Sequence, residues 1–294
     1  MDPTRPRPED HPLVRELLAA YPGSASPTEA MRFAARRRLK KARAYGFAGP
    51  PFNPRILASL LGIKTRSDTL PAGLDAVLAP EPDGRLTIVW NETAPEKRAN
   101  FSVAHEIGHT LFPSCAVEVQ YRNQRGLNFE PDQFVERLCD IAAAELLMPL
   151  DDFKVDLASL GTTAAAVVAL SERYLASQEA VALRMQALHS EPLAVAVVIA
   201  EEVAPGSLDI RALYSVPNRA MRSRWPGLES ADDLRAPSTS GCWATLTGEA
   251  RTRRGLEPWS VAGAPATLDV EALALDSDGA PRSLVLLRPP AVEA

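Results

Sequence analysis

The residues whose types and spacing could do chemistry gather in one short stretch, "FSVAHEIGHTLF" at residues 101–112. His105 and His109 stand four residues apart, and Glu106 directly follows the first histidine. On a helix this spacing stacks both imidazoles on one face, where two neutral ring nitrogens can bind one Zn²⁺ at about 2.0–2.1 Å each. Glu106 is turned away from His105 by about 100°, beside the open coordination position where a general base is needed to take a proton from water. The stretch therefore predicts a catalytic metal site.

A third ligand is available on the next strongly helical segment, "DQFVERLCDIAAAELLMP" at residues 132–149. Glu136 lies near its start. Asp140 follows one turn later on the same face, where its carboxylate can accept the free N–H of a ligand histidine. Three protein ligands with a free fourth position indicate a catalytic site rather than a structural one. Nitrogen and oxygen ligands suit Zn²⁺ and do not exclude Mn²⁺.

The alternative is an apolar core helix that contains two histidines by chance. The whole chain has only four histidines, so two of them around a glutamate at this spacing argue against chance. An incidental pair also predicts no third ligand, whereas Glu136 offers one. We therefore favour the metal site.

The sequence also predicts positions or roles for several residues near this site. Gly108 is expected to leave room beside the metal. Glu145, on the opposite side of the second helix from the third ligand, is expected to face solvent. Cys139 is expected to be a small buried side chain rather than a metal ligand or redox group. Arg98 and Tyr121 are conceivable donors to an oxyanion, although the sequence positions neither.

The composition is that of a soluble globular protein, with 294 residues, 46% apolar and 23% charged. A net charge of −5 gives no overall attraction for nucleic acid or an anionic membrane. Cys115, Cys139 and Cys242 are too few and too scattered for a disulfide framework or a CxxC metal clip. The start, "MDPTRPRPEDHP", lacks the apolar core of a signal peptide, and no apolar run could span a membrane. We therefore expect a cytoplasmic protein with reduced thiols.

Hydrophobic periodicity and turn residues predict alternating helical and extended segments. Helices are expected over 13–21, 54–61, 101–112 and 132–148, and between 153 and 188 with breaks at Gly161-Thr162 and near Ser177. A strand pair is expected at 74–80 and 85–91, with further strands at 193–202, 250–254, 272–279 and 282–290.

Two helical regions could bind nucleic acid. Seven Arg and Lys residues lie between Arg32 and Arg43 and could hold phosphates, although a solvated helix face is the favoured interpretation. Residues 167–188 have a helix–break–helix outline, but the second helix offers only Arg184 as a reader of base edges. A structural hairpin is therefore expected there, and direct DNA binding is not.

Taken together, these segments resemble the ImmA/IrrE family of bacterial metallopeptidases. The likeness covers roughly residues 50–150 and rests on "FNPRILASLLGI", "LTIVWNETAPEKRANFSVAHEIGHTLF" and "VERLCDIAAAELLMP". It implies a zincin-like domain in which His105, His109 and Glu136 bind the metal and Glu106 is the base. The sequence departs from the family at Asp140, where asparagine is usual.

Members of the family's radiation-response branch continue with a helix-turn-helix-like segment and a domain similar to GAF sensor folds. Here "TSGCWATLTGEARTRR", at 239–254, resembles the helix and turn of a GAF domain. The resemblance implies an α+β protein in three parts. These are a zincin-like metallopeptidase domain at 1–152 with a flexible leader at 1–12, a helix-turn-helix-like segment at 153–190, and a GAF-like sensor or docking domain at 191–294.

The resemblance also implies a function. Proteins of this group cleave a helix-turn-helix repressor of the XRE type, which derepresses stress or DNA-damage response genes. We therefore expect a metal-dependent endopeptidase whose partner is a repressor. The alternative is a non-enzymatic regulator that binds DNA or a repressor and uses the metal structurally.

Overall fold

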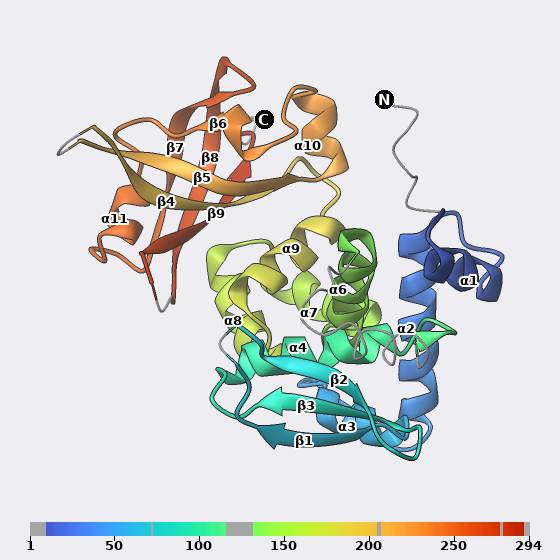
Figure 1. Cartoon of the computed structure of the whole chain (residues 1–294). Coiled ribbons are helices and arrows are strands. Elements are labelled where there is room, and N and C mark those ends of the chain that lie inside the picture. Colours follow the sequence, from blue (N-terminus) through green and yellow to red (C-terminus); the bar gives the residue numbers. More distant parts are fainter. Residues whose placement is uncertain (1–9, 72, 116–131, 205–206, 277–278, 291–294) are drawn as a thin grey trace. The chain divides into compact units, whose positions relative to one another are not determined.

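A computed structural model describes residues 10–71, 73–115, 132–204, 207–276 and 279–290. The chain forms two compact units, Met1–Phe153 with Glu172–Ser177, and Lys154–Ser171 with Gln178–Ala294. Both units combine helices with a sheet, as Figure 1 shows, so a mixed helix and sheet protein was the right expectation. The expected helical segment at 153–190 is shared between the units, and its standing as a separate domain stays a prediction. Within the described residues no helix has the length and apolar character needed to cross a membrane.

The first unit packs helices on one side of a small sheet. Its helices are α1 (Pro12–Ala20), α2 (Pro27–Arg43), α3 (Pro54–Leu60), α4 (Glu96–His109) and α6 (Gln133–Leu147). Its strands are β1 (Lys64–Asp68), β2 (Ala76–Pro80) and β3 (Leu86–Asn91), in the order β1-β3-β2. The expected strand pair is confirmed as antiparallel β2 and β3, while β1, which pairs parallel with β3, was not predicted. Helix α4 lies between the sheet and α6, and α2 packs against α6 (Figure 1).

Side chains just before α3 and α6 fix where these two helices begin, and a turn at the end of β3 precedes α4. The side chains of Asn53 and Asp132 accept hydrogen bonds from the first backbone N–H groups of α3 and α6. Asn91, the last residue of β3, accepts hydrogen bonds from the backbone and hydroxyl of Thr93 at 3.2 and 2.9 Å. This Asn91 turn leads the chain directly from the sheet into α4, the helix that carries both candidate histidines.

Glu145 contradicts its prediction, because its side chain is fully buried. The Arg36 Nε atom of α2 donates to the Glu145 carboxylate at 2.8 Å, and the Leu150 backbone N–H donates to it at 3.3 Å. The helical wheel correctly placed Glu145 opposite the third ligand. It could not show that α2 covers that side of α6.

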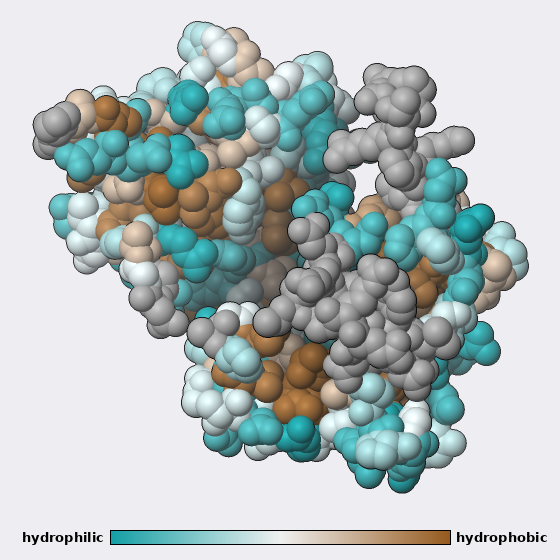
Figure 2. Space-filling view, in the orientation of Figure 1, coloured by the Kyte–Doolittle hydropathy of each residue, from teal (hydrophilic) through white to brown (hydrophobic). Residues whose placement is uncertain are grey.

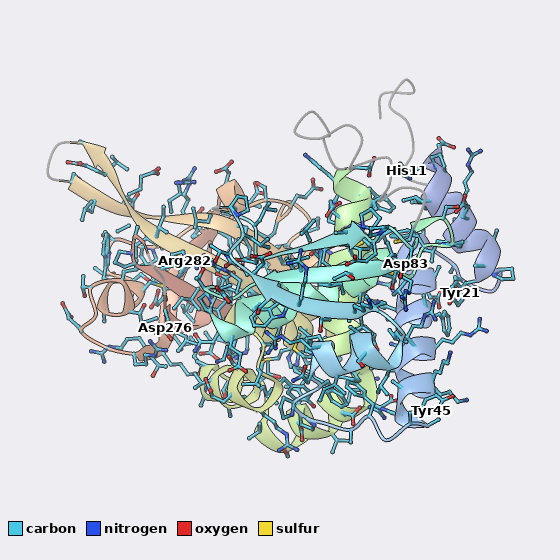
Figure 3. The ribbon with its side chains drawn as sticks, turned by 60° about the horizontal axis from the view of Figure 1, so that its bottom comes forward. His11, Tyr21, Tyr45, Asp83, Asp276 and Arg282 are labelled. Carbon is cyan, nitrogen blue, oxygen red and sulfur yellow. The ribbon has the colours of Figure 1, made fainter. Side chains whose placement is uncertain are left out.

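The basic run on α2 is therefore only partly a solvated face. Arg36 and Arg43 reach acidic groups of the same unit, Glu145 and Asp152. Other basic residues, such as Arg37, stay exposed. Tyr45, which follows the helix, is 69% exposed and is labelled in Figure 3.

The second unit is built on an antiparallel sheet in the order β5-β4-β9-β8-β7-β6. Its strands are β4 (Ala194–Ala204), β5 (Ser207–Pro217), β6 (Leu234–Arg235), β7 (Thr252–Val261), β8 (Ala264–Leu275) and β9 (Arg282–Arg288). The helices α7 (Leu150–Leu160), α8 (Ala164–Tyr174), α9 (Gln178–Leu188), α10 (Arg219–Arg224) and α11 (Cys242–Leu246) complete the described regular structure, apart from one short 3₁₀ turn, Ala231–Asp233. The predicted breaks at Gly161-Thr162 and near Ser177 are confirmed.

Both faces of the central strand β4 are buried. Ala194, Ala196 and Val198 join the main core of the unit, and Val195 and Val197 are equally buried although alternation points them to the other face. This explains why "LAVAVVIA" reads as a continuous apolar run rather than an alternating one.

A ladder of charged side chains crosses the other strands of this sheet. Asp269 pairs with Arg254 at 2.8 Å and with Arg288 at 3.5 Å. Arg288 also reaches Glu271 at 3.3 Å, and Glu271 accepts a hydrogen bond of 2.9 Å from the Ala164 backbone N–H. Glu271 thus places a negative charge at the N-terminus of α8, where the helix dipole favours it.

Candidate metal centre

Helices α4 and α6 bring the predicted ligands together. The Glu136 Oε2 atom lies 3.0 Å from His105 Nε2 and 3.6 Å from His109 Nε2. The two imidazole rings stand edge to face with centroids 5.0 Å apart. His109 is buried and His105 is mostly buried, with 17% of its side chain exposed. Two helix positions one turn apart and one residue of a second helix therefore converge on a single point.

The spacing of these three atoms suits a divalent ion. Nitrogen and oxygen ligands at about 2.0–2.2 Å from a tetrahedral Zn²⁺ lie about 3.3–3.5 Å from one another. The observed separations of 3.0 and 3.6 Å lie on either side of that range. The residues present thus fit the ion that the motif predicts.

Asp140 contacts the opposite edge of the His105 ring. Its Oδ1 atom lies 2.8 Å from His105 Nδ1, which leaves Nε2 directed at Glu136. Burial would lower the pKa of His105, but the hydrogen bonds with Asp140 and Glu136 outweigh it and raise this pKa to about 10. Burial would raise the pKa of Glu136, and the two histidines hold it far below its usual value. The carboxylates on either side thus favour a charged imidazole when no ion is bound.

Gly108 serves the packing of α4 on α6. A Cβ atom at this position would lie 3.1 Å from both the Cα and the carbonyl oxygen of Cys139, and 3.2 Å from the Ala142 Cβ. Only a residue without a side chain lets the two helix backbones approach this closely without a shift. Gly108 therefore helps to bring Glu136 within reach of the histidines, and the expected room beside an ion stays a prediction.

Cys139 lies closer to the histidines than expected. Its sulfur and one ring nitrogen from each of His105 and His109 all lie within 4.8 Å of one another. The residue is fully buried, as predicted, and is not disulfide-bonded. Two side chains of α6, Glu136 and Cys139, are therefore candidates for the ligand beyond the histidines. The shorter distances favour Glu136.

Three further residues were predicted to take part in the chemistry. Glu106 is half-buried on α4, where its charge helps to raise the pKa of His105. Arg98 pairs with Asp75 at 2.8 Å, so its guanidinium is engaged at the start of β2. Tyr121 lies outside the described residues.

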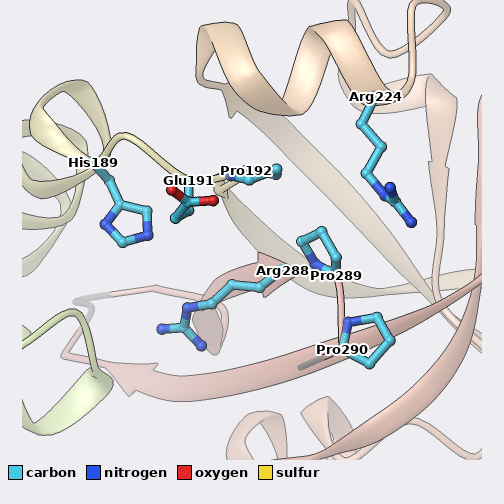
Figure 4. Close-up of a pocket in the computed structure, with 7 residues that line it drawn as sticks. All are labelled: His189, Glu191, Pro192, Arg224, Arg288, Pro289 and Pro290. Carbon is cyan, nitrogen blue, oxygen red and sulfur yellow. The ribbon is translucent and has the colours of Figure 1, made fainter. Parts of the chain in front are cut away.

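Among the described residues of the second unit we find no second group of side chains arranged for catalysis. A cavity of about 430 Å³ there is lined by His189, Glu191, Pro192, Arg224, Arg288, Pro289 and Pro290 (Figure 4). Cys242 is not among its lining residues. Burial raises the pKa of the Cys242 thiol to about 12, which is consistent with a packing role.

The helices expected to resemble a DNA-reading unit keep their polar side chains inside. Arg184 and Gln186 of α9 are buried, and Gln186 donates a hydrogen bond of 3.1 Å to the Val216 carbonyl. The one base-edge reader that the sequence offered is thus not displayed on the surface.

A pair of histidines on one helix and a carboxylate from a second helix form the class of site that can hold one divalent ion. Comparison with known proteins then shows which protein family this part of the chain resembles. The family model of the IrrE N-terminal-like domain matches residues 58–186, which include all the candidate ligands. This part of the chain is therefore similar to the IrrE N-terminal-like domain of the ImmA/IrrE family.

Two individual proteins are similar to the chain. The radiation response metalloprotease IrrE of Deinococcus deserti is 28% identical over 165 residues, which are 51% of this chain and 52% of that protein. The chain thus matches about half the length of this relative. A Mycobacterium tuberculosis transcriptional regulator of known structure aligns with a TM-score of 0.55 at 11% identity, over 94% of this chain and 80% of that one. At that identity the second likeness concerns the fold alone.

Proposed function

We propose that the protein is a metal-dependent endopeptidase whose centre is held by His105, His109 and Glu136. The observation that carries the proposal is the approach of Glu136 Oε2 to both Nε2 atoms, at 3.0 and 3.6 Å. The match of residues 58–186 to the IrrE N-terminal-like domain and the similarity to a named metalloprotease support it. A divalent ion bound there would supply Lewis-acid activation of water and of a peptide carbonyl.

The residues of the chain have distinct roles in this proposal. Glu106, on the turn of α4 that carries His105, accepts the proton of the attacking water and returns it to the leaving amine. Asp140 accepts the His105 Nδ1–H, which fixes the tautomer that presents Nε2 to the ion. Each role depends on a side chain whose position follows from the packing of α4 against α6.

A peptide substrate also needs a surface to bind. Strand β2 pairs only with β3 among the described strands and contacts α4, so it is an edge next to the helix of the histidines. Leu74 and Val77 are 46% and 37% exposed there, and Figure 2 shows apolar surface over this sheet. An extended peptide can add to such an edge through backbone hydrogen bonds, with apolar side chains giving further contact.

The proposed substrate is a helix-turn-helix repressor of the XRE type, whose cleavage would derepress stress or DNA-damage response genes. The name of the Deinococcus relative, a radiation response metalloprotease, supports a peptidase that acts in a damage response, and the choice of an XRE-type repressor follows from the family resemblance of the sequence. The second unit would then sense a signal or dock the repressor, and its helix-flanked antiparallel sheet is compatible with the GAF-like fold expected from the sequence.

The test is to incubate the purified full chain with a purified XRE-type repressor, with and without Zn²⁺ or Mn²⁺, and to follow cleavage on a gel. Glu106→Gln keeps the size of the side chain and removes its basicity, so we expect at least about a hundredfold loss of cleavage rate. Cleavage by this variant at the wild-type rate would contradict the role of Glu106. Salt-sensitive DNA binding that survives the same change, without any cleavage, would instead support the non-enzymatic regulator.

A further inference from the structure

Cys139 lies inside the cluster of candidate ligands, and the proposed function gives it no role. Its sulfur and a nitrogen of each histidine lie within 4.8 Å of one another. In a tetrahedral zinc site, sulfur at about 2.3 Å and nitrogen at about 2.0–2.1 Å from the ion lie about 3.5 Å apart. Binding one ion would therefore require only a small contraction of the cluster.

The backbone holds Cys139 in this place. Its Cα and carbonyl oxygen lie against Gly108, 3.1 Å from where a Cβ of that residue would be. Gly108 belongs to the same turn of α4 as the two histidines. Gly108 thus lets α4 and α6 come closest at the position of Cys139.

The chemistry of the side chain adds a property that nitrogen and oxygen ligands lack. Imidazole and carboxylate groups bind both Zn²⁺ and Mn²⁺, whereas a soft thiolate favours Zn²⁺ over the harder Mn²⁺. Cys139 is fully buried and is not disulfide-bonded.

We propose that Cys139 donates its thiolate sulfur to the ion bound by His105 and His109, and that this sulfur makes the centre selective for Zn²⁺ over Mn²⁺. The inference rests on the proposed function for the existence of the metal site. On binding, the S–H bond breaks, the proton passes to the buffer and a sulfur–metal bond forms, with no change of oxidation state.

The sulfur is added to the ligand set without displacing the carboxylate. Glu136 and Cys139 are three residues apart on α6, at neighbouring positions of one helix face. Zn²⁺ can expand from four ligands to five. Two imidazoles, one carboxylate and one thiolate therefore still leave a position for the water on which Glu106 acts.

The experiment loads the full chain with Co²⁺ as a spectroscopic probe. We expect the wild type to show visible d–d bands together with a sulfur-to-cobalt charge-transfer band in the near ultraviolet. Cys139→Ala and Cys139→Ser should lose the charge-transfer band and keep the d–d bands. Cys242→Ala removes an equally buried thiol from the second unit and should keep both. Competition between Zn²⁺ and Mn²⁺ should show a Zn²⁺ preference at least about tenfold smaller in Cys139→Ala.

A measurement on the unaltered protein avoids any dependence on the folding of the variants. X-ray absorption of the zinc-loaded wild type should show one sulfur atom in the zinc shell. A shell of nitrogen and oxygen only, or a wild-type cobalt spectrum with d–d bands and no charge-transfer band, would overturn the Cys139 proposal and leave the metal site standing. A wild type that binds neither ion would overturn the metal site as well.

Discussion

The carboxylate of Glu136 lies 3.0 Å from the Nε2 atom of His105, although 31 residues separate them in the chain. Two independent helix starts make this approach possible. The Asn91 turn leads the chain from β3 towards α4, and the Asp132 cap begins α6 one turn before Glu136. The site is thus a product of helix packing, and disturbing the packing should disturb the site.

Gly108→Ala tests this dependence. Alanine in a helix is intrinsically favoured over glycine by about 1 kcal/mol, but here its Cβ meets the α6 backbone at 3.1 Å. We expect a net loss of about 1–3 kcal/mol in the free energy of unfolding, together with weaker zinc binding. Chemical denaturation and zinc titration measure the two effects. Gly23→Ala, where a Cβ would meet nothing within 4 Å, is the control and should change neither. An unaffected Gly108→Ala protein would show that the close approach is unimportant.

Asp140 is expected to act through His105. Asp140→Ala removes the oxygen that lies 2.8 Å from His105 Nδ1 and should weaken zinc binding about 10–100-fold. Asp140→Asn keeps an acceptor at the same place, so it should restore most of the affinity. Arg137→Ala alters an exposed neighbour on the same helix and serves as the control. Equal affinities for the alanine and wild-type proteins would remove Asp140 from the account.

The buried pair of Arg36 and Glu145 should stabilise the first unit. Arg36→Met leaves the fully buried Glu145 carboxylate without its cation, and we expect a loss of about 2 kcal/mol because the arginine is itself partly exposed. Arg37→Met, at the exposed neighbouring position, should cost less than about 0.5 kcal/mol. Denaturant unfolding compares the two variants. Equal stabilities would mean that the pair contributes nothing measurable.

Asp269 should make the second unit sensitive to acid. Its hydrogen bond with Arg254 outweighs burial and holds the pKa of this carboxyl below its usual value. A depressed pKa in the folded state contributes stability above the unfolded pKa of about 3.9, and that stability is lost as the pH falls through the folded pKa.

Asp269→Asn should therefore lower the free energy of unfolding by about 1 kcal/mol at pH 6, with the difference from wild type shrinking as the pH falls below about 4. The fluorescence of Trp259, buried in the same unit, can follow this transition. Asp276→Asn is the matched control, because Asp276 pairs with Arg251 while 82% of its side chain is exposed. A difference that stays constant between pH 6 and pH 3 would contradict the assignment.

The local patterns of the sequence predicted most of the regular structure. The Asn53-Pro54 helix start, the breaks at Gly161-Thr162 and near Ser177, and the β2–β3 pair all follow from turn residues and periodicity within a few positions. Strand β1 was missed because "KTRSD" has no apolar alternation and is mostly exposed. The backbone pairing of β1 with β3, and not the side-chain pattern of β1, holds this segment in the sheet.

Only those features of the candidate site that depend on residue spacing within one helix could be predicted from the sequence. The spacing of His105 and His109 fixes their common face. The error at Glu145 concerns which neighbour covers a helix face. The contact of Gly108 with α6 is of the same kind, and the residue spacing of a single helix shows neither. Cys139 was judged by its residue type alone, because its closeness to the histidines depends on the distance between α4 and α6.

The amount of zinc bound per chain tests the central claim most directly. Wild-type protein, His109→Ala and Glu136→Ala are stripped of metal, titrated with Zn²⁺ and analysed by competition with a chelator. We expect one tightly bound ion per wild-type chain and at least about tenfold weaker binding in each variant. Wild-type affinity in Glu136→Ala would contradict this expectation, since the carboxylate that lies within 3.6 Å of both imidazole nitrogens would then not be holding an ion.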